Sequence, residues 1–184
     1  SCTYLNSRCY SNFLNFESKL YQMTLSLTLA ILKPEVYKAP YFLREIRKTI
    51  LASNFLVLRT KRKHLTEDDA AILYSEHKSK MFYGRLISYM TSGTIWLHVL
   101  AHPNAIQHWR NMIGSTKVYK SQFENEISLR SRFGLSDTRN SFHGSDSPLS
   151  AEREIKFLFP DFNFEDWENE QSTVASRCVF NITS

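Results

Sequence analysis

Glycine is scarce in this chain, with only 5 among 184 residues, at positions 84, 93, 114, 134 and 144. No two of them have the G-x-G-x-x-G spacing of a dinucleotide-binding turn or the G-x-x-x-x-G-K-[ST] spacing of a phosphate-binding loop. Glycine-rich loops of these kinds are therefore excluded. If the protein handles phosphates, side chains must hold them.

Cysteine is also scarce, and the three present are Cys2, Cys9 and Cys178. An odd number without C-x-x-C spacing argues against a disulfide framework and against a zinc site. We therefore expect a reducing compartment, cytoplasmic or mitochondrial, and no secretion. The glycosylation sequon at Asn181 is interpreted as chance. No apolar run approaches the length of a transmembrane helix, so no membrane span is predicted.

The charge balance is mildly positive, with 23 Lys and Arg against 18 Asp and Glu, a net charge of +5. Such an excess favours anionic partners without choosing among nucleotides, nucleic acid and phospholipid. The densest basic run is Arg59–His64. We interpret it as the solvated end of a strand, and nucleic-acid binding as unlikely, because dedicated nucleic-acid proteins have denser basic stripes.

The length predicts one domain with flanking segments. Residues 1–22 are rich in Ser, Asn, Tyr and Phe and contain a single acid, Glu17. They are predicted to be an N-terminal extension, either a targeting segment or disordered, with Met23 as a possible alternative start. The domain is expected over 23–160. The tail, 161–184, begins with an acidic stretch.

Apolar patterning predicts four strands, over 25–32, 55–63, 94–101 and 140–143. Helices are predicted over 40–53, from Thr66 to about His77, over 82–90, from Pro103 to Met112 and from Pro148 to Phe159. Residues 115–139 are polar and aperiodic and predict a long loop. This order is typical of an α/β (α+β) ferredoxin-like sandwich, with a four-stranded antiparallel sheet covered by helices. It does not determine the order of the strands.

Of the six histidines, His143 has the most informative neighbours. Gly144 follows it and permits close backbone approach or positive φ. Ser145 and Asp146 offer hydrogen bonds, and a helix beginning near 147 would direct N–H groups back towards this point. His98 and His102 are four residues apart, but the H-E-x-x-H pattern is missing, so a metal pair is not expected there. By spacing alone, the His143 segment is equally consistent with a capped turn.

The run Asn140-x-x-His143-Gly-Ser-Asp146, followed by Ser150-Ala-Glu-Arg-Glu154, resembles the signature of nucleoside diphosphate kinases. The resemblance extends over about residues 24–160. It includes Ala30–Glu35, 77–90, Ser92-Gly93, Trp109–Thr116 and Ser128–Phe133. The stretch 134–140 and the long segment before it look most like the divergent sixth-type (group II) isoform.

The resemblance implies ping-pong phosphoryl transfer between nucleoside tri- and diphosphates through a phosphohistidine at His143. An imidazole suits this role because it is mostly neutral and nucleophilic near physiological pH. By the same resemblance, Glu154 matches the carboxylate that bonds the other ring nitrogen. Ser145 and Tyr74 match hydroxyl groups close to the histidine.

The resemblance also implies a nucleotide site. Arg110, Thr116 and Arg130 match phosphate-contacting positions, and Lys33 and Asn140 match the groups that hold the sugar 3′-hydroxyl, with Lys33 also near the transferred phosphate. Phe82 matches the aromatic ring on which the base stacks, and Leu86 the apolar contact opposite. Stacking predicts little base preference. The implied cofactor is Mg2+, carried mainly by the nucleotide phosphates, with no metal site of the protein's own.

The segment between Thr116 and Arg130 is longer than the usual one and lacks its proline. Because this loop contributes to subunit contacts in the family, a homo-oligomer is expected but a hexamer is doubtful. An alternative hypothesis is a catalytically weak, kinase-like scaffold or binding protein that acts through a partner, possibly in mitochondria. Phosphate uptake by His143 and its delivery to a diphosphate distinguishes the two.

Overall fold

A computed structural model describes residues 24–124 and 126–171. The predicted extension 1–22, the three cysteines and Asn181 lie outside the described residues. Within these ranges, no helix is both long enough and apolar enough to cross a membrane.

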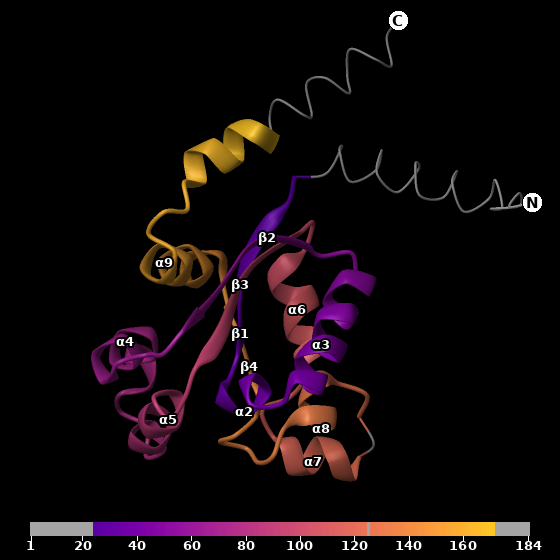
Figure 1. Ribbon diagram of the computed structural model, residues 1–184, viewed down its shortest axis with the longest axis vertical. Helices are drawn as coiled ribbons and strands as arrows, with labels where there is room; N and C mark the ends of the chain where they lie inside the picture. The colour runs from indigo at the N-terminus through magenta and orange to yellow at the C-terminus, as the bar shows by residue number, and fades with distance from the viewer. Residues whose placement is uncertain (1–23, 125, 172–184) are drawn as a thin grey trace, which may run out of the picture.

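The sheet has four strands: β1 (Ser26–Leu32), β2 (Leu56–Lys63), β3 (Ile95–His102) and β4 (Phe142–Gly144). Their order is β2-β3-β1-β4, and every neighbouring pair is antiparallel. The predicted ferredoxin-like sandwich is therefore confirmed. β1 is a central strand, with β3 on one side and the short β4 on the other (Figure 1).

Helices cover both faces of the sheet (Figure 1). Alternation along β1 explains why: Leu29 and Ile31 enter one core cluster, whereas Ala30 and Leu32 enter the other. The first cluster packs against α4 (Glu67–Leu73), α5 (Tyr83–Met90) and α9 (Pro148–Leu158). The second packs against α2 (Pro34–Tyr37), α3 (Pro40–Ala52), α6 (Ala105–Ile113) and α8 (Leu129–Phe133).

Helix starts follow the local sequence. Thr66 caps α4 in a reciprocal capping box: the Asp69 N–H donates to Thr66 Oγ1 at 3.0 Å, and the Thr66 N–H donates to Asp69 Oδ2 at 3.1 Å. Ser147 caps α9 by accepting from the Ser150 N–H, with Pro148 at the first helical position. Both starts agree with the sequence prediction.

Two predicted boundaries were wrong. The helix from Thr66 ends at Leu73 and is followed by a short 3-10 turn, η1 (Ser75–His77). The helix expected from Pro103 begins at Ala105, because Asn104 is the cap, with non-helical backbone (φ −133°, ψ 58°), and its N–H donates to His102 Nδ1 at 3.0 Å.

Residues 115–139 are not a continuous loop. They contain α7 (Val118–Phe123) and α8, the latter capped by Ser128 through Ser131. Helices of six and five residues are too short to produce a visible apolar period.

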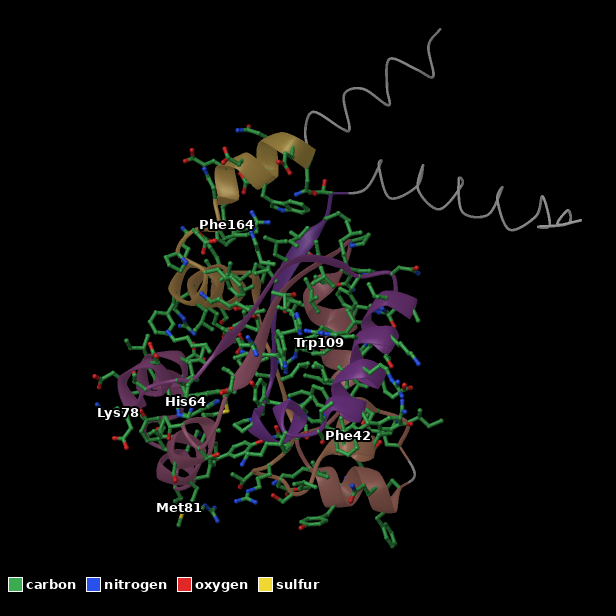
Figure 2. The ribbon with its side chains drawn as sticks, viewed as in Figure 1. Phe42, His64, Lys78, Met81, Trp109 and Phe164 are labelled. Atoms are coloured by element: carbon green, nitrogen blue, oxygen red, sulfur yellow. The ribbon has the colours of Figure 1, made fainter. Side chains whose placement is uncertain are left out.

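Residues 161–171, assigned to the tail by sequence, stay close to the core. Phe162 is buried, and Phe164 and Trp167 pack against the cluster under α9 (Figure 2). Residues 164–171 are helical. Arg59 of the basic run in β2 lies over the Phe162 ring, 5.7 Å from its centroid. The acidic stretch is thus joined to the domain through its aromatic residues.

Gly144 is required for the packing of Trp109 on β4. Trp109 is fully buried between the sheet and the helices (Figure 2), and its Nε1–H donates to the His143 carbonyl at 3.0 Å. A Cβ on Gly144 would lie 2.8 Å from Trp109 Nε1 and closer still to Cδ1. The ring can reach the His143 backbone only because residue 144 has no side chain.

Gly144→Ala is expected to destabilise the protein by about 1–3 kcal/mol, because the Trp109 ring must move out of a close-packed core. Urea unfolding followed by tryptophan fluorescence measures the change. Gly84→Ala is the matched control: nothing lies within 4 Å of its added Cβ, and residue 84 is helical. The control should be neutral or stabilising by up to about 1 kcal/mol. Equal effects of the two variants would contradict the packing argument.

Candidate active site

His143 lies on β4, opposite Ile31 of β1, and its ring faces the side of the sheet covered by α4 and α9. Its Nε2 is 2.9 Å from Glu154 Oε2. A carboxylate accepts, so Nε2 carries the proton and donates, which leaves the Nδ1 lone pair free. The histidine is thus held in one tautomer with a nucleophilic nitrogen exposed to the site.

Glu154 is itself fixed by a second donor. It lies on α9 and is buried, and Ser145 Oγ donates to the same Oε2 at 2.7 Å. Ser145 is fully buried and accepts from the Leu29 N–H of β1 at 3.1 Å. A continuous hydrogen-bonded chain therefore joins the central strand to the histidine ring, which restricts its orientation.

Tyr74 follows the last residue of α4 and presents the edge of its ring to His143, with 5.8 Å between the ring centroids. Its hydroxyl is buried and has no hydrogen-bond partner among the described residues. Burial, with the charge of Glu154, raises the pKa of Tyr74. Tyr74 therefore stays protonated, and its hydroxyl keeps a proton that it can donate in a hydrogen bond.

Lys33 directly follows β1 and is buried, and its Nζ donates to Asn140 Oδ1 at 2.8 Å. Asn140 is oriented by a second bond, from Nδ2 to the Asp137 carbonyl at 3.1 Å. Burial and, next, the nearby charge of Arg130 lower the pKa of Lys33, and the charge of Glu35 partly opposes them; the resulting pKa is about 7. The structure thus brings together Lys33 and Asn140, two residues that the sequence separates by more than a hundred positions.

Arg130 is buried, with its guanidinium bound to backbone. Nη1 donates to the Gly114 carbonyl and Nη2 to the Phe142 carbonyl, while Nε is buried and has no hydrogen-bond partner in the part of the chain that the structure describes. Burial, with the charge of Arg110, lowers the pKa of Arg130 to about 10. It therefore remains a cation, placed against the strand that carries His143.

The remaining residues expected from the resemblance differ in exposure: three are at least partly exposed and one is buried. Arg110 on α6 and Thr116 after it are exposed. Phe82, just before α5, is 40% exposed, and its ring is 5.7 Å from that of His77, which stacks on Tyr74. Leu86 is buried in the core cluster beneath α5. Met81, beside Phe82, points into solvent (Figure 2).

Cations lie close together at the site: the charge of Arg130 acts on Lys33 and that of Arg110 acts on Arg130, while the Glu154 carboxylate accepts from Ser145 and His143. Among the described residues, no group of three or more His, Cys, Asp or Glu side chains could hold a metal ion.

Sequence reasoning did not select Glu35, Ser141 or Tyr89, which lie at the back of the site. The Glu35 carboxylate accepts from Ser141 Oγ at 2.9 Å and from the Tyr89 hydroxyl. Ser141 directly follows Asn140 and has φ 66°. Of the three, only Glu35 had a sequence signal, which was its position next to Lys33-Pro34. The hydrogen bonds that join these residues link distant segments and leave no periodic pattern in the sequence.

Comparison with known proteins identifies the family. The family model for nucleoside diphosphate kinase matches residues 26–164. The chain therefore belongs to the nucleoside diphosphate kinase family.

Its resemblance to the sixth type is confirmed by similar proteins named nucleoside diphosphate kinase 6. The protein from Xenopus tropicalis is 44% identical over 80% of this chain and 82% of its own length. The human protein is 42% identical over 80% of this chain and 79% of its own length. Among solved structures, the Aquifex aeolicus nucleoside diphosphate kinase is 31% identical with a TM-score of 0.70, over 74% of this chain and 96% of that one.

The buried Lys33 predicts a specific dependence of stability on pH. Its folded pKa of about 7 lies below the ordinary value of 10.5, so the unfolded chain binds more protons between these two values. The free energy of unfolding should therefore rise with pH across this window, by up to about 1.4 kcal/mol per pH unit from this group.

Lys33→Met lacks this contribution and should show a flatter pH dependence. Its stability relative to wild type is expected to be greatest at or below about pH 7 and to decline towards about pH 9. Urea unfolding of both proteins over this range provides the measurement. The slope is compared, because loss of the bond to Asn140 shifts stability equally at each pH. If the free energies of unfolding of the two proteins change with pH in parallel, the pKa of Lys33 is not lowered in the folded protein.

Proposed function

We propose that this protein is an active nucleoside diphosphate kinase that transfers the γ-phosphate of a nucleoside triphosphate to a nucleoside diphosphate through a phosphohistidine at His143. The observation that carries the proposal is the contact between His143 Nε2 and Glu154, which leaves Nδ1 as the free nucleophile. Family membership and the buried cations nearby support it.

In the first half-reaction, the Nδ1 lone pair attacks the γ-phosphorus. A P–N bond forms, the bond to the β,γ-bridging oxygen breaks, and the diphosphate leaves with that electron pair. In the second, a terminal oxygen of another diphosphate attacks phosphorus and the electron pair returns to Nδ1. Glu154 stabilises the positive charge that develops on the ring, as a carboxylate does for a catalytic histidine.

The barrier to such a transfer is lowered mainly by positioning and by cations. Lys33 and Arg130 are buried, so their charges are little screened by water. Arg110 on α6 and Thr116 after that helix are exposed, and their side chains would contact phosphates of the bound nucleotide. Mg2+ bound to the phosphate oxygens would neutralise further charge. Lys33 and Asn140 would hold the sugar hydroxyl.

Phe82 provides a half-exposed ring at the start of α5 on which a base could stack. Stacking is favourable for every base, at roughly 1–3 kcal/mol, and does not depend on the hydrogen-bonding groups at the edge of the base. The proposed substrates are therefore nucleoside tri- and diphosphates as a class, with little preference among bases. Assembly into a homo-oligomer stays a prediction.

The deciding experiment is labelling with γ-³²P-ATP and Mg2+, followed by a chase with GDP. Wild type should acquire an acid-labile, alkali-stable label that GDP removes as GTP. His143→Ala should acquire none, because the attacking nitrogen is lost. The control is His64→Ala, which removes an exposed histidine at the end of β2 (Figure 2) and should label normally.

A folded wild-type protein with no label above His143→Ala would overturn the kinase proposal. The kinase-like binding protein would then be the better hypothesis. Label that persists in His143→Ala would instead show that another residue is the phosphate acceptor.

Glu154→Gln is expected to slow phosphorylation of His143 by about tenfold to a hundredfold, because a neutral amide replaces a charge-assisted hydrogen bond of similar shape. Rapid-quench measurement of label against time gives the rate. Glu152→Gln, on the same helix and paired only with the exposed Lys156, is the matched control and should match wild type. A Glu154→Gln rate equal to wild type would remove Glu154 from the mechanism.

A further inference from the structure

Three separate segments meet on the carboxylate of Glu35. Glu35 lies on α2, two residues after Lys33. Its Oε1 accepts from Ser141 Oγ, in the turn before β4, and its Oε2 accepts from the hydroxyl of Tyr89 on α5. Both donors are buried. Hydrogen bonds to a charged acceptor are stronger than neutral ones, so this carboxylate is a strong tether among the three segments.

The turn that it holds is conformationally unfavourable. Ser141 has φ 66°, and the Phe142 N–H donates across it to the Asn140 carbonyl at 2.8 Å. Such a three-residue turn with positive φ is rare and strained for a residue with a side chain. It persists only where its surroundings determine it. Here the Ser141 carbonyl accepts from the Lys33 N–H at 2.9 Å, and its hydroxyl reaches Glu35 and the Phe133 carbonyl.

This turn determines where Asn140 points. Asn140 precedes Ser141, and its Oδ1 receives the Lys33 ammonium at 2.8 Å. Release of Ser141 would free the turn to relax, and Asn140 Oδ1 would leave Lys33. The position of both side chains thus depends on Glu35, although Glu35 bonds to neither.

Glu35 also acts on the charge of Lys33. The groups that influence Lys33 are Arg130 from α8, the Tyr89 ring from α5 at 5.5 Å, the Asn140 amide and Glu35 from α2. Burial and Arg130 both favour the neutral amine, whereas Glu35 favours the ammonium. Glu35 is the carboxylate among these groups. Without it, burial and Arg130 would lower the pKa of Lys33 with no opposing negative charge from this set.

We propose that Glu35 is a positioning residue that holds the Asn140–Ser141 turn through Ser141 and places a carboxylate charge near Lys33, so that Asn140 and Lys33 are set for binding the phosphates of a nucleoside diphosphate. The inference rests on the proposed function for the identity of the ligand. It does not require that the histidine be phosphorylated.

The test combines Glu35→Gln, Glu35→Asp and Ser141→Ala with two readouts. The first is the titration of Lys33 in the nucleotide-free protein, followed by the ¹³Cε shift of labelled lysine and assigned with Lys33→Met. The second is the Kd for ADP with Mg2+ by calorimetry over a range of pH. Thermal melting verifies folding, and Glu45→Gln, which removes a surface carboxylate on α3, is the control for loss of an acid.

Glu35→Gln should shift the Lys33 midpoint to lower pH and raise the Kd for ADP about threefold to tenfold near pH 8, with little effect near pH 6. Glu35→Asp should restore the midpoint because it restores the charge. Ser141→Ala keeps the carboxylate charge and should move the midpoint less than Glu35→Gln does, while weakening ADP binding at every pH. Glu45→Gln should behave as wild type.

A folded Glu35→Gln protein with an unchanged Lys33 midpoint and an unchanged Kd overturns the inference, as does a lower melting temperature without either shift. If Glu35→Gln does not fold, an unchanged ADP affinity in Ser141→Ala overturns it. A wild-type protein that does not bind ADP counts against the proposed function instead, and the Lys33 titration then decides the positioning role by itself.

Discussion

The pairing of β4 with β1 is the constraint on which the site depends. β4 has only three residues, yet their register places His143 opposite Ile31 and therefore on the face covered by α4 and α9. The same pairing brings the Ser141 carbonyl to the Lys33 N–H. Because side chains alternate along a strand, a shift by one residue would turn His143 away from Glu154. The fully buried Trp109, bonded to the His143 carbonyl, helps to fix that register from the opposite face.

The site concentrates buried cations with few acids to neutralise them. Desolvation of Lys33 and Arg130 lowers both pKa values, which means that the folded protein holds these charges at a cost in stability. A ligand that brings several negative charges would relieve that cost. The proposed phosphate site of a chain with five glycines and no phosphate-binding loop would thus be made of side chains.

Much of the fold was predictable because its signals are local. The alternation in β1, the capping box at Thr66 and the Ser147-Pro148 start each need only a few neighbouring residues. The helices α7 and α8 were missed because they are too short to show a period, and the end of α4 was misplaced because Tyr74 leaves the helix where its ring meets His143. Propensity cannot anticipate contacts that form between distant segments.

The sequence by itself determined the four strands and the longer helices along the chain, the family resemblance and the residue types available at the site, because these follow from local patterning and motif spacing. Only the tertiary structure decided that Glu154 and Ser145 share one oxygen beside His143, that Lys33 is buried against Asn140, and that Glu35 joins α2, α5 and the turn before β4. The physical reason is that burial and hydrogen bonds between remote segments set the charge and orientation of these groups. Both depend on the surroundings of a side chain rather than on its neighbours in the chain.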